Sequence, residues 1–395
     1  MIVRSKQKLL RNELIKHFYF NHQLTLSELS KLTHKSLPVV TSTVNSLIED
    51  GYIQEHGLAR STGGRRASAF TLNDQKKRYI IAVAVDQLVT RVVIYDLLNN
   101  IKMEPGIKEL ALVSAPALID TFITFLKDYI SRSNIPLNQI LGIGIGMPGF
   151  VNAELGVNHT FFKSEQDLNL KKHLTQELGV PVFIDNDSSL IALAELKFGA
   201  GKHLKDVLVV NVGWGTGLGM IVNGSLFRGH SGYAGEFSHI PLSQSNKLCS
   251  CGKRGCLEVD TSLVVMIERA KSEINAGASS SMEQIFKETG ELSADHFLQA
   301  AKSGDPLAVS ILSDAAFLIG KGMSTLIHIM NPKLMVLSGR GAIAGKILMA
   351  PIQQAINEFC IPWLAEQTEI QVSKLAEDSE LLGAATLVIE NCNFN

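Results

Sequence analysis

The sequence has little of two features that would decide its class at once, net charge and long apolar runs. Among its 395 residues, 37 basic side chains are balanced by 38 acidic ones, so the chain as a whole is not polybasic. The longest uncharged stretches, 136–153 and 207–227, are interrupted by Gly, Asn, Ser or Pro, which excludes a lipid-facing helix. No apolar segment with a small-residue cleavage site opens the chain. We therefore expect a cytoplasmic protein without membrane insertion.

Cysteine is scarce as well, and its distribution excludes a disulfide framework. Of the five cysteines, Cys249, Cys251 and Cys256 lie within eight positions, while Cys360 and Cys392 stand alone. The cluster indicates a metal site instead. An apolar content of 46% excludes a disordered or fibrous chain, and the length suggests roughly two or three domains.

The N-terminal 70 residues differ from the rest in charge. They hold ten basic and five acidic side chains, so this part is about +5 and the remainder about −6. Helical spacing of apolar residues predicts a first helix over 6–20. Thr25 and Glu28 have capping-box spacing, which predicts a second helix from Leu26 to about Thr33. Ser36 can cap a third helix, with Val40, Val44, Leu47 and Ile48 buried and Gly51 ending it.

Two short helices joined by a tight turn are typical of a helix-turn-helix, and a wing follows them. Strands over 52–55 and 67–72 would flank a loop with two glycines and two arginines. The alternative is a small structural or protein-binding domain. We expect DNA binding, through these residues: Lys35, Ser36, Thr41, Ser42, Asn45, Arg65 and Arg66. Thr41, Ser42 and Asn45 are candidates for base edges, and the others for phosphates or the minor groove.

After a boundary near residue 74, strands and helices alternate, which predicts an α/β body. Buried strands are expected at 79–85, 91–95, 140–146 and 182–184, and helices at 116–131 and 304–330. Segments 206–213 and 215–221 predict a hairpin around a glycine turn. Such a turn can hold a phosphate or be purely structural.

One histidine and three cysteines carry the strongest chemical signal. His239, Cys249, Cys251 and Cys256 offer one imidazole and three thiolates at tight loop spacings, which suits tetrahedral zinc. Four protein ligands leave no position for an activating water, so the predicted zinc, one per chain, is structural. The alternative is a chance grouping of thiols in a glycine-rich loop.

Polar residues around this loop predict a sugar site. Glu236 precedes His239 by three positions, and Glu258 follows Cys256 by two. Together with Asn186 and Asp187 they would supply fixed acceptors for the adjacent hydroxyls of a sugar. Each acid taken alone could equally be a surface or helix-capping residue.

These motifs together resemble the ROK family of bacterial repressors and sugar kinases, and the resemblance spans essentially the whole chain. The segments that carry it are Gly232–His239 and Cys249–Glu258, with weaker support from 146–149, 186–187, 215–219 and 63–66. The resemblance implies an α/β fold with an N-terminal winged helix-turn-helix followed by a two-lobed actin-like ATPase (ribonuclease H-like) body.

The resemblance also assigns boundaries and roles. It implies a DNA-binding domain over 1–74, a first lobe over 75–188 completed by 380–395, and a second lobe over 189–379 with the zinc loop and oligomerisation helices. His239 would serve zinc through one ring nitrogen and a sugar through the other. Asp187 corresponds to the catalytic base of the family's kinases.

The chain departs from the kinase pattern in its phosphate turn. Family kinases carry Asp-x-Gly-Gly-Thr, whereas residues 86–90 here read Asp-Gln-Leu-Val-Thr. Replacing both glycines with Leu88 and Val89 should block the close backbone approach to ATP phosphates. A smaller departure is Ser238, where the family usually has glycine.

We therefore expect a sugar-responsive transcriptional regulator, a repressor of carbohydrate uptake or catabolism genes, rather than an enzyme. Its expected partners are operator DNA and a sugar or sugar phosphate, and one wing per chain predicts a homodimer or a dimer of dimers. One alternative is an ATP-dependent sugar kinase with a DNA-binding arm. Another is a regulator controlled by a protein partner, with a vestigial sugar cleft.

Overall fold

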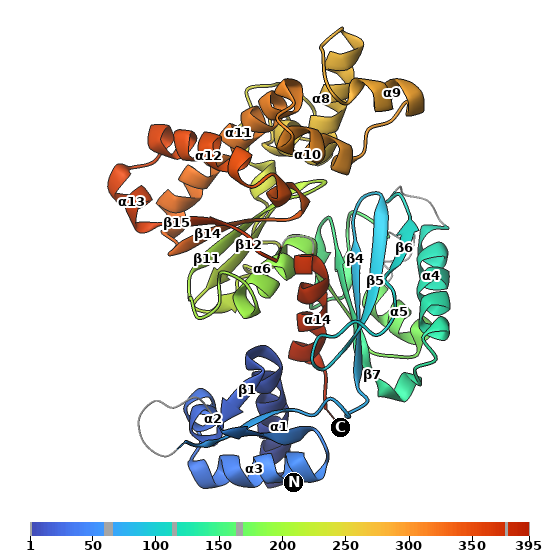
Figure 1. Cartoon of the computed structure of the whole chain (residues 1–395), viewed down its shortest axis with the longest axis vertical. Helices are drawn as coiled ribbons and strands as arrows, with labels where there is room; N and C mark the ends of the chain where they lie inside the picture. Colours follow the sequence, from blue (N-terminus) through green and yellow to red (C-terminus); the bar gives the residue numbers. More distant parts are fainter. Residues whose placement is uncertain (1, 59–65, 113–116, 163–168, 376–377, 395) are drawn as a thin grey trace. The chain divides into compact units, whose positions relative to one another are not determined.

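The computed structural model of the chain divides into two compact units of mixed α/β structure (Figure 1). The structure describes residues 2–58, 66–112, 117–162, 169–375 and 378–394. Unit 1 comprises 1–145, 162–184 and 384–395, and unit 2 comprises 146–161 and 185–383.

Unit 1 begins with three helices and a small antiparallel sheet, as a winged helix-turn-helix requires. The elements are α1 (Ile2–Asn21), β1 (Gln23–Thr25), α2 (Leu26–Thr33), α3 (Leu37–Glu49), β2 (Ile53–Leu58) and β3 (Ser68–Leu72), with strand order β1-β3-β2. The predicted capping box is confirmed: the Thr25 hydroxyl accepts from the Glu28 amide at 3.3 Å, and the Glu28 carboxylate accepts from the Thr25 amide at 2.8 Å. Gly51 follows α3 with a left-handed φ of +71°, so the predicted stop is also confirmed.

Two details of α3 differ from expectation. Ile48 is 37% exposed, whereas Val40, Val44 and Leu47 are fully buried. At about 100° per residue, Ile48 is turned about 80° away from Val40, which places it at the edge of the buried face. Ser36 occupies the N-cap position, but its side chain makes no capping hydrogen bond. Its carbonyl instead accepts the first helical bond, from the Val40 amide.

The remainder of unit 1 is built on a five-stranded sheet. Its strands, in spatial order, are β10 (Val182–Asn186), β7 (Ile140–Met147), β4 (Tyr79–Val85), β5 (Val89–Asp96) and β6 (Gly106–Glu109). The helices and the 3-10 turn are α4 (Leu118–Arg132), η1 (Leu137–Gln139), α5 (Leu170–Leu178) and the second half of α14 (Ser379–Asn391). The apolar runs predicted as strands are thus confirmed, with six of the seven residues of β4 buried.

Unit 2 contains a second five-stranded sheet with apolar clusters on both faces. Its strands, in spatial order, are β13 (Ser225–Leu226), β12 (Thr216–Val222), β11 (Val207–Val212), β14 (Leu334–Ser338) and β15 (Glu369–Val372). Side chains alternate along β11: Leu208 and Val210 join the cluster that the larger helices cover, while Val207 and Val209 pack with Ile191 of α6 (Asp187–Lys197). The predicted glycine hairpin is the antiparallel β11–β12 pair.

Helices and short elements complete unit 2. They are β8 (Val151–Asn152), β9 (Val157–Asn158), η2 (Phe237–His239), α7 (Glu258–Thr261), α8 (Leu263–Asn275), α9 (Glu283–Thr289), α10 (Ala294–Lys302), α11 (Pro306–Met330), η3 (Arg340–Ala344), α12 (Lys346–Phe359) and α13 (Pro362–Gln367). By length and composition alone α11 could cross a membrane. Its Leu312, Ile319 and Met323 are instead buried in the core of this unit, as in the central helix of a globular domain.

Candidate functional site

The four predicted metal ligands of unit 2 come together. The ligand atoms of His239, Cys249, Cys251 and Cys256 all lie within 4.8 Å of one another. The sulfur atoms of Cys251 and Cys256 are 3.6 Å apart, and Nδ1 of His239 is 3.5 Å from the Cys249 sulfur. With Zn–S bonds of about 2.3 Å, neighbouring thiolates around a tetrahedral zinc are about 3.8 Å apart. The donor set therefore fits a zinc ion in both chemistry and size.

The thiols have a further reason to need a cation. Burial, together with the adjacent thiols of Cys251 and Cys249, raises the pKa of the Cys256 thiol to about 12. Three thiolates at this separation repel one another, so a divalent ion is what allows them to ionise together. All five cysteines of the chain are free of disulfide bonds in the structure.

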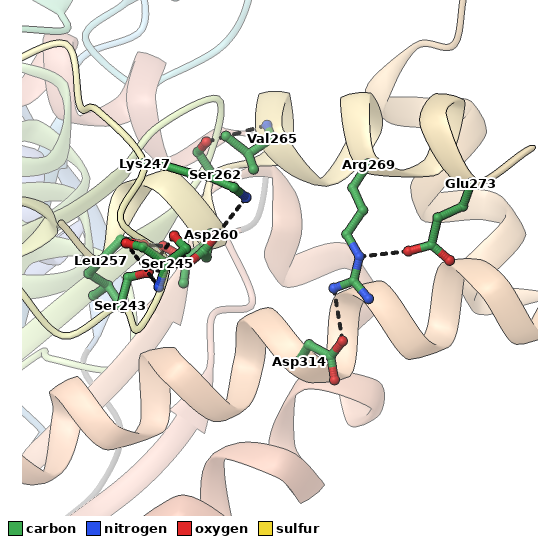
Figure 2. A network of polar contacts seen from close by, with 11 residues as sticks. Ser243, Ser245, Lys247, Leu257, Asp260, Ser262, Val265, Arg269, Glu273 and Asp314 are labelled. Carbon is green, nitrogen blue, oxygen red and sulfur yellow. Dashed lines mark hydrogen bonds and ion pairs between the residues drawn. The ribbon is translucent and has the colours of Figure 1, made fainter. Parts of the chain in front are cut away.

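A polar clamp fastens the cysteine loop to α7 (Figure 2). Asp260 accepts hydrogen bonds from Ser243, from Ser245 at 2.8 Å and from Lys247 at 2.8 Å. The loop is also paired with itself, since the Cys249 amide donates to the Lys253 carbonyl at 2.8 Å. These contacts tie the loop that carries the cysteines to the short helix that carries Glu258.

Two carboxylates flank the imidazole of His239. Glu236 Oε2 lies 3.7 Å from Nε2, and Glu258 Oε2 lies 3.9 Å from Nδ1. Partial burial, together with the nearby carboxylates of Asp187 and Glu258, raises the pKa of Glu236 to about 7. Asp187 and Glu258, two of the predicted sugar-binding acids, thus lie near enough to Glu236 in unit 2 to repel its carboxylate. A hydroxyl-bearing ligand that donates to them would relieve their mutual repulsion.

Two glycines allow the acids to lie where they do. Gly235 has a φ of +103°, and a Cβ there would lie 2.4 Å from the Leu218 carbonyl oxygen, so no other residue fits just before Glu236. A Cβ at Gly215, in the β11–β12 turn, would lie 2.8 Å from Glu258 Oε1. The glycine turn therefore approaches the acids closely.

Asn186 and Asp187 lie at the start of α6. The amide oxygen of Asn186 accepts from the backbone amides of Ser188 and Ser189, at 3.0 and 3.2 Å, so this side chain caps the helix. Helix capping is thus one structural role of Asn186. Asp187 accepts from the Ser188 amide at 2.7 Å. Its effect on Glu236 places it with the other acids.

Aromatic residues that the sequence reading did not select also lie at this site. The Phe150 ring is 5.9 Å from the His239 imidazole, with 30° between their planes, and 6.3 Å from the Tyr233 ring. Phe150 is 89 positions from His239, and Tyr233 lies in the Gly232–His239 segment, where roles were expected for Glu236 and His239 alone. The one local signal was Phe150 following the Met-Pro-Gly turn.

Among the described residues of unit 1, most of the predicted DNA-contacting residues are exposed, and Thr41 is half-buried. Thr41, Ser42 and Asn45 line a groove of about 640 Å³ along α3, together with Gln7 at the start of α1. Lys35, Ser36 and Arg66 are exposed as well, and Arg65 falls outside the described residues. The groove is lined by apolar Leu37 and Pro38 as well as by polar side chains, and it lies on the side of α3 opposite Val40 and Leu47.

Residues 86–90 of unit 1, which stand where family kinases have their phosphate-binding turn, bond two of their own backbone amides internally. Oδ1 of Asp86 accepts from the backbone amides of Leu88 and Val89, at 2.8 and 2.7 Å. Leu88 is 45% exposed. The two amides that glycines would present to a phosphate in the kinase pattern therefore bond to a carboxylate of the same turn.

Known proteins resemble the chain over most of its length. The model of the ROK family matches residues 97–391. A xylose repressor of Caldicellulosiruptor bescii is 29% identical over 377 residues, covering 94% of this chain and 93% of that protein. A glucokinase of Halalkalibacterium halodurans is 31% identical over 280 residues, covering 70% of this chain and 85% of the enzyme.

A solved structure shares the fold. The crystal structure of a ROK family transcriptional regulator, a homologue of the Escherichia coli Mlc protein, aligns with a TM-score of 0.75 and 23% identity. The alignment covers 93% of this chain and 91% of that one. The likeness therefore shows that the two proteins share a fold over most of their length.

Proposed function

This chain belongs to the ROK family, and we propose that within it the chain is a sugar-responsive DNA-binding transcriptional regulator, a repressor of carbohydrate uptake or catabolism genes. The observation that carries the proposal is the N-terminal winged-helix arrangement with its exposed polar face on α3. The match to the xylose repressor covers 94% of this chain, so it must include most of residues 1–74. The glucokinase likeness leaves 30% unmatched.

In this proposal residues 1–74 bind operator DNA. Thr41, Ser42 and Asn45 would read base edges, while Lys35, Ser36, Arg65 and Arg66 would contact phosphates or the minor groove. We propose a first lobe over 75–188 with 380–395 and a second lobe over 189–379, and the residues of the sensor all lie in unit 2 of the structure. We place the protein in the cytoplasm, where operator DNA and incoming sugars meet.

The sensor combines a structural zinc with a sugar site. His239, Cys249, Cys251 and Cys256 would hold one zinc ion, which cross-links the cysteine loop to the turn carrying Glu236. Asn186, Asp187, Glu236, His239 and Glu258 form the proposed sugar site, in which Asn186 would contribute its remaining amide hydrogen. Sugar binding lowers DNA affinity if the sugar prefers a conformation that DNA does not.

We propose that the chain does not act as a kinase. Asp86 ties up the Leu88 and Val89 amides, and phosphoryl transfer depends on such amides to position and stabilise the transferred phosphate. The alternative, an ATP-dependent sugar kinase with a DNA-binding arm, is favoured by the retained Asp187 and by the glycine turn at 215–219.

We further propose a homodimer, since one winged helix covers one half-site. Four apolar side chains at the ends of α11, α12 and α13 suit such a contact: Ile329, Phe359, Ile361 and Trp363 are 70, 38, 56 and 67% exposed. The start of α13 lies beside the end of α11, because the Ile361 amide donates to His328 Nε2 at 3.0 Å. A second copy of the chain, meeting this patch through its own, is the occupant we propose, and further association into a dimer of dimers is compatible with it.

The experiment that tests the function is selection of bound fragments from genomic DNA by the purified protein, followed by affinity measurement with and without sugars. The proposal expects one palindromic operator, and release by a sugar. Loss of DNA binding in Asn45→Ala, with sugar affinity kept, would support the assigned face. Wild-type protein that selects no sequence would refute the proposal. Release that requires a protein partner instead of a sugar would favour a protein-controlled regulator.

A further inference from the structure

Phe150 is held firmly inside the proposed sugar site. The carbonyl of Gly149 accepts from Asn186 Nδ2 at 3.3 Å, and the ring of the next residue, Phe150, lies against His239. The Phe150 amide donates to the Thr160 hydroxyl at 2.9 Å, and its carbonyl accepts from the His159 amide at 2.9 Å. The β8–β9 hairpin thus fixes an aromatic ring between two members of the proposed sugar set.

Tyr233 extends this aromatic surface. Its ring meets Phe150 edge-on, with 81° between the planes, and lies 6.1 Å from the His159 ring. Tyr233 is three positions before Glu236, on the loop that Gly235 shapes. The hairpin therefore supplies Phe150, and this loop supplies both Tyr233 and the carboxylate of Glu236.

The two kinds of side chain suit one ligand chemistry. Carboxylates accept hydrogen bonds from hydroxyls, and an aromatic face attracts weakly positive C–H groups. A sugar ring offers both, with hydroxyls around its edge and C–H groups on its face. The site therefore matches an amphipathic neutral sugar better than a fully polar ligand.

The charges of the site disfavour a phosphate. A phosphate monoester carries about −1.5 to −2 charges at pH 7 and is normally bound by arginine or lysine. Among the described residues, the basic side chain recorded near Glu236 and Glu258 is His239, and as a zinc ligand its imidazole would carry no charge. Arg228, on the loop that leads to Glu236, is already paired with the buried Asp185. Zinc with three thiolates adds a further net negative charge.

We propose that this site binds an unphosphorylated sugar whose C–H face packs on Phe150 and Tyr233, and that it excludes the corresponding sugar phosphate. This inference rests on the proposed sugar-sensing function and goes further by naming the ligand class. It also makes Phe150 a specificity-determining residue.

The test is calorimetric titration of the full-length, zinc-loaded protein with matched pairs: glucose, fructose, mannose and N-acetylglucosamine, each against its 6-phosphate, with xylose and inorganic phosphate alongside. We expect at least one neutral sugar to bind, and its phosphate to bind at least about tenfold more weakly. A phosphate that binds more tightly than its parent sugar would overturn the inference and leave the sensing function standing. Binding of neither kind would refute the sensing function, and the inference with it.

A variant series tests the aromatic contact. Phe150→Ala should weaken binding of the neutral sugar about tenfold, and Phe150→Trp should restore most of it, with zinc content unchanged throughout. Phe286→Ala is the matched control, because Phe286 is a half-buried phenylalanine of the same unit that packs on the helical core. Equal affinities of Phe150→Ala and the wild type would show that the ring does not touch the sugar.

Discussion

The clamp at Asp260 allows a quantitative test of the metal site. Replacing Asp260 with Asn keeps the shape of the side chain but removes the charge that Ser243, Ser245 and Lys247 share. A hydrogen bond to a charged group contributes about 1.5–3 kcal/mol. Lys247 is 58% exposed, so its ion pair contributes at most about 1 kcal/mol. Because asparagine can still accept one of the serine bonds, the expected loss is about 2 kcal/mol of loop stability.

That loss should appear as weaker zinc binding. Since 1.4 kcal/mol is about tenfold in an equilibrium constant, 2 kcal/mol corresponds to roughly thirtyfold, in the range seen when supporting groups of metal sites are removed. The assay is competition for zinc with a chromophoric chelator. Lys247→Ala is the control and should change zinc affinity by less than about fivefold.

Two results would contradict the proposed role of Asp260 or the metal site itself. If Asp260→Asn and the wild type bind zinc within about threefold of each other, the clamp does not support the metal site. If neither protein retains zinc after preparation in zinc-containing buffer, the metal site itself is wrong. Thermal unfolding of both proteins checks that the substitution acts locally rather than by destabilising the whole chain.

Three further predictions concern other parts of the chain. Arg65→Ala combined with Arg66→Ala should weaken operator binding at least tenfold and leave sugar affinity unchanged, as measured by anisotropy and calorimetry; unchanged operator affinity would refute the wing assignment. Trp363→Ser should shift the protein toward monomer in analytical ultracentrifugation, and dimers of wild-type strength would exclude this patch as the interface. Calorimetry with magnesium ATP should detect no binding, because the backbone amides of Leu88 and Val89 already bond to Asp86. Clear binding would favour the kinase alternative.

Local signals predicted much of this fold, because they depend on neighbouring residues alone. The capping box at Thr25 and Glu28, the stop at Gly51 and the strand at 79–85 all form as expected. The predicted burial of Ile48 was wrong, because helical spacing alone does not show how far the buried face extends around the helix. Ser36 sits at the predicted cap position without the side-chain bond, since its backbone carbonyl alone starts the helix.

The site was predictable where its residues are close in sequence. Cys249, Cys251 and Cys256 share one loop, and the structure brings His239 to them. Phe150 escaped notice because only folding brings it to His239, and a single aromatic residue carries no spacing signal. The bonds inside the 86–90 turn were also hidden, since the sequence shows that the glycines are replaced but not where the amides point.

The central claim is that sugar binding in unit 2 controls DNA binding by the N-terminal helices. Its most direct test is fluorescence anisotropy of the protein on its selected operator, with and without the sugar that binds in calorimetry. We expect the sugar to weaken operator binding at least tenfold, and Glu258→Gln to bind the operator normally without responding to the sugar. An operator affinity that the bound sugar leaves unchanged would contradict the account.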